Sequence, residues 1–485
     1  MDTKYEAVIG LEVHAQLSTK SKAFCGCSTK FGNEPNTNVC PICLGHPGVL
    51  PVLNKKVVEF TTLMGLATNC KINSKSVFAR KNYFYPDLPK GYQISQYELP
   101  ICEHGWIEVT TADKEKRKIG ITRIHMEEDA GKSIHDRGNE TLVDVNRCGV
   151  PLMEIVSEPE LKTAEEAYLY LSKIRQLVRY LGICDGNMEE GSLRCDANIS
   201  IRLKGDPVLG TKTEIKNMNS FRNVERAINY EIERQIDLVE NNERVVQETL
   251  LWNADLNEAF SMRSKEEAHD YRYFPDPDLM PVFVDDIWLE NISESLPELP
   301  DIKKERFVRQ YLLPVYDAEV LTQSKPIADY YEKVASNTDD YKSASNWIRG
   351  DVLKILNDEK IEIPNFSISP DSLAELINLI RSGAISGKIA KDIFPEMLAS
   401  NISPTAIVKE KNLLQVSDVK VIEKTVDEIL SSHPQEVEEY LSGKEKVIGF
   451  FIGRIMKQTA GKANPQIVNK ILHERLNSLK IIKGE

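Results

Sequence analysis

The stretch from residue 119 to residue 159 is the most informative part of this chain, because it combines β-prone sequence with unusual chemistry. It contains IGITRIHMEED (residues 119–129) and DVNRCGVPLMEIV (residues 144–156). In both segments, ionisable side chains lie within apolar, β-prone sequence instead of a solvated run of charges. An ionised carboxylate beside a hydrophobic core is costly unless a cation or hydrogen bonds compensate for it. Together with Glu12-Val13-His14 near the start of the chain, these segments predict a site for a hard metal ion that is built from separate strands.

Alternating side chains indicate that these segments are strands with two different faces. In residues 5–17, Glu12 and His14 share one face, where a metal ion or a phosphate could bind, although the solvent face of an edge strand explains the pattern equally well. In residues 106–128, His125 and Glu127 share a face, and Glu128 falls on the other face unless a bulge intervenes.

A third polar strand face is predicted between two helices. Polar residues recur at every second position from Arg194 to Ser200, as expected where a sheet lines a substrate cleft or faces solvent. Thr163, with Glu166 three residues later, predicts the start of one helix, and Ser220 predicts the start of the other. The apolar stripes of both helices are expected to face the core.

Composition and charge limit the class of protein. The 485 residues are 41% hydrophobic and 28% charged, which suits two to four globular domains. No apolar run approaches the roughly 18 residues that span a bilayer, and no signal peptide is recognisable, so we expect a cytoplasmic protein without membrane contact. The net charge of −13 argues against a coat of nucleic acid. Residues 441–485, with nine Lys or Arg against three Glu, are either a solvated helical face or a local contact for phosphates.

Four of the nine cysteines form a motif. An odd number of cysteines in a chain without an export signal argues against a disulfide framework. The C-x-C-x12-C-x2-C spacing of Cys25, Cys27, Cys40 and Cys43 is that of a structural zinc site with four thiolates. Four free thiols or two redox pairs are the alternatives, and the spacing favours zinc. The other five cysteines are isolated and are expected to be small core residues.

Several common catalytic motifs do not occur. Residues 130–133 read Ala-Gly-Lys-Ser, but Met126 stands where a P-loop needs its first glycine. The chain has no G-x-G-x-x-G fingerprint, no Ser/Gly-rich amidase signature and no Cys or Thr at residue 2. Any ATP is therefore expected to be held by a different fold, and hydrolysis by a nucleophilic triad is not expected.

The segment DVNRCGVPLMEI (residues 144–155) resembles the signature of the B subunits of tRNA-dependent amidotransferases, the GatB family. The matching motifs also include residues 10–14, 80–87, 125–129, 189–196 and 270–275. The resemblance implies an α+β fold with a large mixed-sheet cradle domain, an all-α helical domain and a small helical YqeY-like tail that contacts tRNA. Shifts in composition place these domains at residues 1–294, with the zinc-binding insertion at 25–43, at 295–402 and at 403–485.

The resemblance also implies an activity and partners. GatB proteins use ATP to phosphorylate the side-chain carboxylate of Glu-tRNA(Gln) or Asp-tRNA(Asn). Ammonia from the glutaminase subunit GatA then gives Gln-tRNA(Gln) or Asn-tRNA(Asn), in a heterotrimer completed by the small subunit GatC. The competing hypothesis is a non-catalytic tRNA-binding scaffold whose carboxylates only stabilise the cradle; the intact acidic constellation favours the ligase.

By the family pattern, the catalytic Mg²⁺ ligands are Glu12, His14, Glu128 and Glu154. Strand parity prefers Glu127 to Glu128, so both remain candidates, and because histidine is an unusual Mg²⁺ ligand, Mn²⁺ is an alternative. The candidates for binding ATP or substrate are Arg80, Lys81, Tyr83, Arg147, Ser192, Arg194 and Lys216. Leu250 and Asn253 depart from the family pattern, which usually has Arg and Asp there.

Overall fold

The computed structural model describes residues 4–134, 140–262, 271–414, 419–459 and 463–482. The chain divides into two compact units, residues 1–300 and 301–485, which are described separately. Asp270, of the motif at residues 270–275, and Lys462 and Lys483, two of the basic residues in 441–485, lie outside the described residues.

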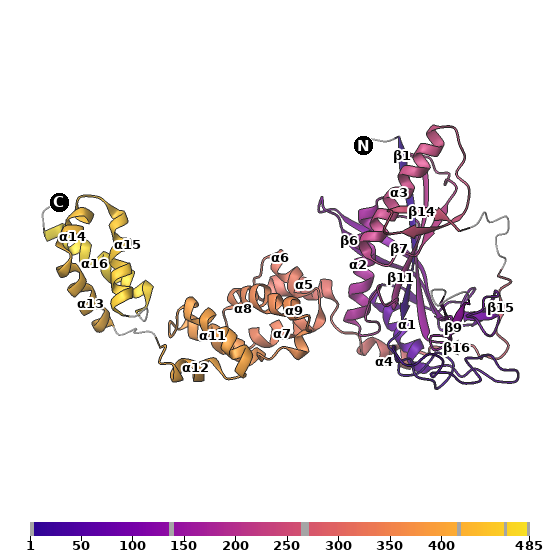
Figure 1. Ribbon diagram of the computed structural model, residues 1–485, viewed down its shortest axis with the longest axis horizontal. Helices are drawn as coiled ribbons and strands as arrows, with labels where there is room; N and C mark the ends of the chain where they lie inside the picture. The colour runs from indigo at the N-terminus through magenta and orange to yellow at the C-terminus, as the bar shows by residue number, and fades with distance from the viewer. Residues whose placement is uncertain (1–3, 135–139, 263–270, 415–418, 460–462, 483–485) are drawn as a thin grey trace. The chain divides into compact units, whose positions relative to one another are not determined.

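The first unit is built on a nine-stranded mixed sheet of order β14-β13-β12-β11-β1-β10-β7-β6-β2 (Figure 1). Its strands are β1 (Tyr5–Gln16), β2 (Lys71–Ile72), β6 (Cys102–Thr110), β7 (Lys116–Glu128), β10 (Pro151–Ser157), β11 (Leu193–Leu203), β12 (Thr213–Lys216), β13 (Thr249–Asn253) and β14 (Glu258–Ser261). Only β12 and β13 pair in parallel among these strands. The predicted α+β class with a large mixed sheet is confirmed.

The strand register places the polar residues in one row. His14 of β1 lies opposite Glu154 of β10, and Glu154 lies opposite His125 of β7. On the other side of β1, Glu12 lies opposite Asp196 of β11. Directly opposed residues project from the same face of a sheet, so these side chains share one face. The predicted strands and the shared face of Glu12 and His14 are confirmed.

Helices cover the opposite, apolar face of the large sheet (Figure 1). They are α1 (Lys55–Ala67), α2 (Ala164–Tyr180) and α3 (Phe221–Glu240), with α4 (Asp286–Glu294) packed on α1. The hydroxyl of Thr163 accepts a hydrogen bond from Glu166 N at 3.1 Å, and the hydroxyl of Ser220 accepts one from Asn223 N at 3.2 Å. The two predicted helix starts are therefore confirmed, with their side-chain caps.

Three small sheets complete the first unit. β15 (Phe274–Pro275), β4 (Ala79–Asn82) and β5 (Tyr92–Ser95) form one sheet, β16 (Val282–Phe283) pairs with β3 (Lys75–Ser76), and β8 (Lys132–Ile134) pairs with β9 (Leu142–Asp144). The β4–β5 hairpin packs against the end of β7, where Ser95 donates a hydrogen bond to Glu127. This hairpin therefore brings side chains from residues 79–95 to the polar face of the large sheet.

The second unit is helical and contains two separate hydrophobic cores, one within residues 307–408 and the other within residues 422–476. The elements before residue 411 are α5 (Pro300–Gln310), α6 (Val315–Leu321), α7 (Lys325–Ala335), α8 (Tyr341–Trp347), the π-helix η1 (Ile348–Val352), α9 (Leu353–Glu359), the 3-10 helix η2 (Ile363–Asn365), α10 (Pro370–Arg381), α11 (Gly387–Ser400) and α12 (Pro404–Glu410). The remaining elements are α13 (Val419–Ser432), α14 (Pro434–Leu441), the 3-10 helix η3 (Glu445–Val447), α15 (Ile448–Gln458) and α16 (Pro465–Ile482).

The two helical cores correspond only roughly to the predicted domains at residues 295–402 and 403–485, and these boundaries remain predictions. Ile407 and Val408 of α12 belong to the first helical core, although they follow the predicted boundary at residue 402. Within the described residues, no helix is both long and apolar enough to cross a membrane.

Gly105 allows β6 to lie close to the end of α1. A Cβ atom at residue 105 would lie 2.2 Å from Cys70 Sγ and 2.7 Å from Thr68 O. Because backbone must move to relieve this clash, we expect Gly105→Ala to lower the free energy of unfolding by about 1–3 kcal/mol. Gly10→Ala is the control, since its Cβ would meet other atoms only at 3.7 Å or more. Urea unfolding followed by circular dichroism measures both, and equal stability of the two variants would contradict the prediction.

Candidate active site

The polar face of the sheet holds two groups of potential metal ligands. One consists of His14, Glu127 and Glu154 and the other of Glu12, Asp196 and Glu214, and within each group the ligand atoms lie within 4.8 Å of one another. The groups are neighbours, because Glu12 and His14 are successive residues on one face of β1. Five of these six side chains are carboxylates, so the face concentrates negative charge that a divalent cation would neutralise.

Two histidines share the charge of Glu154. The Oε2 atom of Glu154 lies 3.4 Å from His14 Nε2 and 3.3 Å from His125 Nε2. Burial disfavours ionisation of Glu154, but His125 and His14 outweigh this effect and hold the pKa of Glu154 well below its usual range. Burial also opposes the charge of His125, yet Glu154 and Glu127 raise its pKa to about 9. The neighbouring carboxylates therefore favour the protonated form of His125.

The second group of acids is compensated by a lysine and an amide. Lys216 Nζ lies 2.6 Å from Asp196 Oδ2 and 2.9 Å from Glu214 Oε1. Asn198 donates a hydrogen bond of 2.9 Å to Glu12. Burial and the charges of Glu154 and Glu214 nevertheless raise the pKa of Glu12. A cation bound here would stabilise the ionised form of Glu12, so the donor set fits a hard divalent ion.

A cavity of about 300 Å³ opens onto both groups. Its lining includes Glu12, His14 and Glu154 together with Lys81 and Lys216. Lys81 is held among acids and rings: its Nζ lies 5.0 Å from the centre of the Tyr271 ring, and Glu127 and Tyr273 raise its pKa although burial opposes them. With Lys212, which also lines it, the cavity thus combines cation ligands with three lysines that can contact phosphate oxygens.

The structure brings Glu127, and not Glu128, together with His14 and Glu154. Glu127 accepts hydrogen bonds from Ser95 Oγ at 2.7 Å and from Gln93 Nε2 at 3.1 Å. Glu128 projects from the other face, where it forms an ion pair with Lys90 and accepts a hydrogen bond from Ile94 N at 2.9 Å. The alternation of residues along β7, which favoured Glu127, agrees with this geometry.

The remaining predicted site residues fall into two sets. Arg194 lies across from His14 on β11 and pairs with the buried Asp129, which also pairs with Arg147 at 3.5 Å. The hydroxyl of Tyr83 donates a hydrogen bond of 3.4 Å to Gln93, which itself contacts Glu127. These residues border the polar face.

Arg80 and Ser192 are engaged elsewhere. Arg80 forms ion pairs with Asp276 at 2.8 Å and with Asp278 at 2.7 Å. The hydroxyl of Ser192 donates to Asp185 and accepts from Asn187 N at 3.1 Å, so it closes its own loop. The structure therefore does not bring these two side chains to the ligand groups.

The sequence did not single out Asp196 and Glu214 as potential ligands. Both lie on polar strand faces that the alternation indicated, but only the pairing of β11 with β1 and with β12 brings them to Glu12. At the two positions that depart from the family pattern, Leu250 is a buried core residue. Asn253 accepts hydrogen bonds from the backbone of its own turn.

The four predicted cysteines also converge. Sulfur atoms of Cys25, Cys27, Cys40 and Cys43 lie within 4.8 Å of one another, and all four are free thiols. The backbone N–H of Cys40 donates to Cys43 Sγ at 3.2 Å. A hydrogen bond from the Cys25 thiol lowers the pKa of Cys43. Four convergent sulfurs with hydrogen-bond donors aimed at them fit a metal ion of tetrahedral preference.

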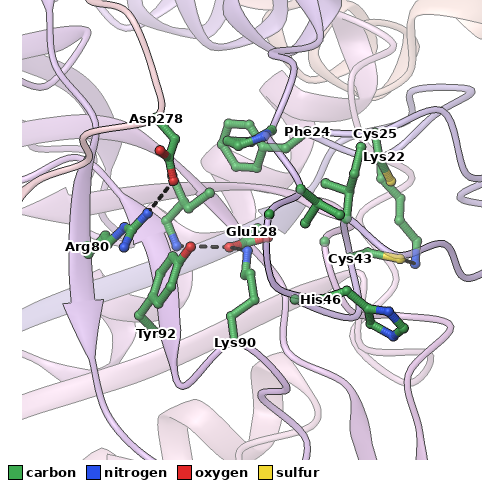
Figure 2. A pocket seen from close by; sticks show the side chains of 17 residues that line it. Lys22, Phe24, Cys25, Cys43, His46, Arg80, Lys90, Tyr92, Glu128 and Asp278 are labelled. Carbon is green, nitrogen blue, oxygen red and sulfur yellow. Dashed lines mark hydrogen bonds and ion pairs between the residues drawn. The ribbon is translucent and has the colours of Figure 1, made fainter.

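A second cavity, of about 230 Å³, lies between the cysteines and Glu128 (Figure 2). Its lining includes Lys22, Cys43, Lys90, Arg80 and Glu128. Because Glu127 and Glu128 are consecutive in β7, this cavity and the ligand groups lie on opposite sides of one strand end.

Comparison with known proteins identifies the family of this chain. The sequence profile of the GatB/GatE catalytic domain matches residues 7–290, and the profile of the GatB domain matches residues 329–476. The chain belongs to the GatB family. A relative from Thermodesulfovibrio yellowstonii, named as the B subunit of an aspartyl/glutamyl-tRNA(Asn/Gln) amidotransferase, is 57% identical over 473 residues, 98% of this chain and 99% of the relative. One of the same name from Chlorobium limicola is 58% identical over 474 residues, 98% of this chain and 100% of the relative.

Membership in the GatB family confirms the resemblance seen in the sequence. The match to the catalytic-domain profile spans every strand of the large sheet except the first residues of β1. The ligand groups of the polar face therefore lie within the part of the chain that this family shares as its catalytic domain.

Metal binding at His14, Glu127 and Glu154 is expected to tighten as pH rises. Glu154 raises the pKa of His14 above 6.5, although burial opposes the shift. Below that raised pKa a bound cation must displace the proton, and above it no proton has to leave. We expect the Kd for Mn²⁺ to fall by up to about tenfold per pH unit below the pKa.

Electron paramagnetic resonance of free Mn²⁺ at pH 6 to 9 measures this dependence. His14→Asn removes one competing proton and should flatten the curve. A Kd that is the same at pH 6 and pH 8 in the unmodified protein would contradict the prediction.

Proposed function

We propose that this chain is the ATP-dependent catalytic B subunit of a tRNA-dependent amidotransferase. It acts on Glu-tRNA(Gln), Asp-tRNA(Asn) or both, and forms the corresponding amide. The observation that carries the proposal is the pair of ligand groups on one sheet face, beside Lys81 and Lys216, in a chain that matches relatives of this name over their full length.

The reaction needs an activated acyl group, because a carboxylate has no adequate leaving group for attack by ammonia. In the first step, a carboxylate oxygen of the substrate side chain bonds to the γ-phosphorus of ATP, and the bond to ADP breaks. In the second step, ammonia bonds to the acyl carbon, the C–O bond to phosphate breaks, and the excess proton leaves with the phosphate. The products are the amide, ADP and phosphate.

This site suits phosphoryl transfer, which depends mainly on positioning and neutralisation of charge. His14, Glu127 and Glu154 would hold one divalent cation, and Glu12, Asp196 and Glu214 would hold another. Mg²⁺, or Mn²⁺ because of the imidazole ligand, would offset the charge of the phosphates when bound. Lys81 and Lys216 would contact phosphate oxygens from the cavity wall.

Arg194 is suited to orient the substrate at the other end of the row. Arg194 lies opposite His14 in the strand register, its guanidinium pairs with Asp129, and its Nε is buried without a hydrogen-bond partner among the described residues. Asp129 itself accepts a hydrogen bond of 2.7 Å from Gln16. A guanidinium fixed in this way can bind a carbonyl or phosphate oxygen without further ordering.

Ammonia has to be delivered by a partner, since the sequence contains no amidase signature. We infer that it enters through the cavity beside Lys90 and Glu128 (Figure 2). Gln93 links that cavity to the ligand groups, because its Nε2 donates both to Glu127 Oε2 and to Glu128 O. The partners are the glutaminase subunit GatA, the small subunit GatC and misacylated tRNA, which the basic residues of the C-terminal stretch would contact.

The four cysteines are proposed to hold a structural Zn²⁺. A closed set of four thiolates leaves no open position for substrate. A non-catalytic scaffold is not favoured, because a purely structural cradle has no need for five carboxylates that converge in two groups at the polar face.

Glu127 and Glu128 are expected to serve different steps. Glu127→Gln should slow Glu-tRNA-dependent ADP formation by about 100-fold, because a cation ligand is lost. Glu128→Gln, its matched control on the other face, should keep ADP formation within a few-fold. It should slow amide formation with glutamine as the nitrogen donor, and added ammonium should restore much of that rate.

The assay uses the purified heterotrimer with misacylated tRNA and labelled ATP, and it measures ADP and amide separately. Unchanged ADP formation in both Glu127→Gln and Glu154→Gln would rule out the proposed cation site. Loss of ADP formation only in Glu128→Gln would show that Glu128, and not Glu127, belongs to it.

A further inference from the structure

Lys22 is a buried cation at the four-cysteine centre. It is 0% exposed, and its Nζ donates to Asn38 O at 2.7 Å and to Cys43 Sγ at 3.6 Å. Figure 2 shows its side chain reaching the Cys43 sulfur along the wall of the cavity. The hydrogen bonds of its ammonium group within the described residues go to this carbonyl and this sulfur. A buried ammonium needs a negative partner, and the Cys43 sulfur that it contacts becomes one when it is a thiolate.

The charge of a filled centre calls for such a cation. Four thiolates and one Zn²⁺ have a formal charge of −2, and burial makes an uncompensated charge costly. Cys43 is buried, whereas Cys25, Cys27 and Cys40 are only partly buried, so bulk water solvates those three residues more readily than Cys43. Lys22 therefore contacts the cysteine of the four that is buried in the chain.

The fold holds Lys22 in this position from both ends of its side chain. Its backbone N–H donates to Cys27 O at 3.0 Å, and Ala23 N donates to Gly149 O at 2.9 Å. Gly149 has a φ of +80°, and a Cβ there would lie 3.5 Å from Lys22 Cδ and 3.6 Å from Cys43 Cβ. The turn at residues 146–149 thus packs over the methylene groups of Lys22 and restricts their position.

We propose that Lys22 is a positioning residue of the metal centre, which compensates the charge of its thiolates and retains the bound Zn²⁺ through Cys43. The proposal rests on the zinc centre proposed above. It does not depend on the amidation reaction, so its readouts are metal retention and the electronic state of the sulfur ligands.

The test uses the zinc-loaded heterotrimer. Lys22→Met removes the charge at similar length, Lys22→Arg keeps it, and Lys20→Met is a control at an exposed lysine two residues away. Loss of Lys22 should speed zinc release to a chromogenic chelator by roughly 10–100-fold, as removal of a partner of a metal ligand does. Lys22→Arg should retain most of the wild-type behaviour, and Lys20→Met should equal wild type.

Cobalt substitution gives a second readout that a purely structural role would not move. Without the ammonium, the Cys43 thiolate is more electron-rich, so the sulfur-to-Co²⁺ charge-transfer band should shift to lower energy in Lys22→Met. Lys22→Gln, which keeps a hydrogen-bond donor without the charge, should shift it in the same direction and serves if Lys22→Met folds poorly.

The outcomes separate the two proposals. One zinc per chain, with release and cobalt spectra that are the same in wild type, Lys22→Met and Lys22→Gln, would overturn the role of Lys22 alone. A wild-type complex with no zinc and four reactive thiols would overturn both the zinc centre and the role of Lys22, and would leave the amidation proposal standing.

Discussion

Repulsion among carboxylates gathered on one face of a β-sheet is the constraint on which this structure depends. Five carboxylates converge there in two groups, and the opposite face of the same strands packs against helices α1, α2 and α3. Because one face of these strands is buried against helices, the acids on the other face cannot move apart. Their negative charge therefore has to be compensated by cations at the site itself. Two histidines and Lys216 compensate part of this negative charge within the protein. Bound divalent cations would compensate the rest of the negative charge and would in turn bind phosphates. The same concentration of acids that is costly for the fold therefore suits the site to phosphoryl transfer.

The same principle operates at the cysteine centre, where sulfur atoms take the place of carboxylates. There the excess charge comes from sulfur, and a fully buried lysine from the loop before Cys25 lies against one thiol. The cavity of Figure 2 separates this centre from the Glu128–Lys90 pair. Consecutive glutamates at the end of β7 therefore face two chemically distinct sites, and Gln93 contacts both residues. Glu127 and Glu128 thus lie between two regions. The cavity of Figure 2 is suited to the entry of ammonia, and the polar face of the sheet is suited to metal-bound phosphates.

Much of this could be predicted from local patterns, because period-two alternation and helix caps are short-range properties. The strand that contains Glu12 and His14, the cap residues Thr163 and Ser220, and the convergence of the four cysteines all agree with the structure. Parity along one strand was also sufficient to prefer Glu127 to Glu128, where the family pattern pointed to Glu128. By contrast, Asp196 and Glu214 were not predicted as ligands, since their role depends on which strands are neighbours. Ser192 and Arg80 were expected at the site, but local hydrogen bonds and ion pairs hold them elsewhere.

The family, the α+β class, the polar strand faces and the group of four cysteines could all be recognised in the amino-acid sequence. These features are written in residue types and short spacings, which do not depend on distant contacts. The strand order β12-β11-β1-β10-β7 is seen only in the folded protein. This order determines which acidic side chains lie close together. The tertiary structure also decided that Lys22, which no sequence motif singles out, is buried against Cys43. Pairing between strands that are more than a hundred residues apart is chosen by the packing of the whole sheet, and no local pattern encodes it.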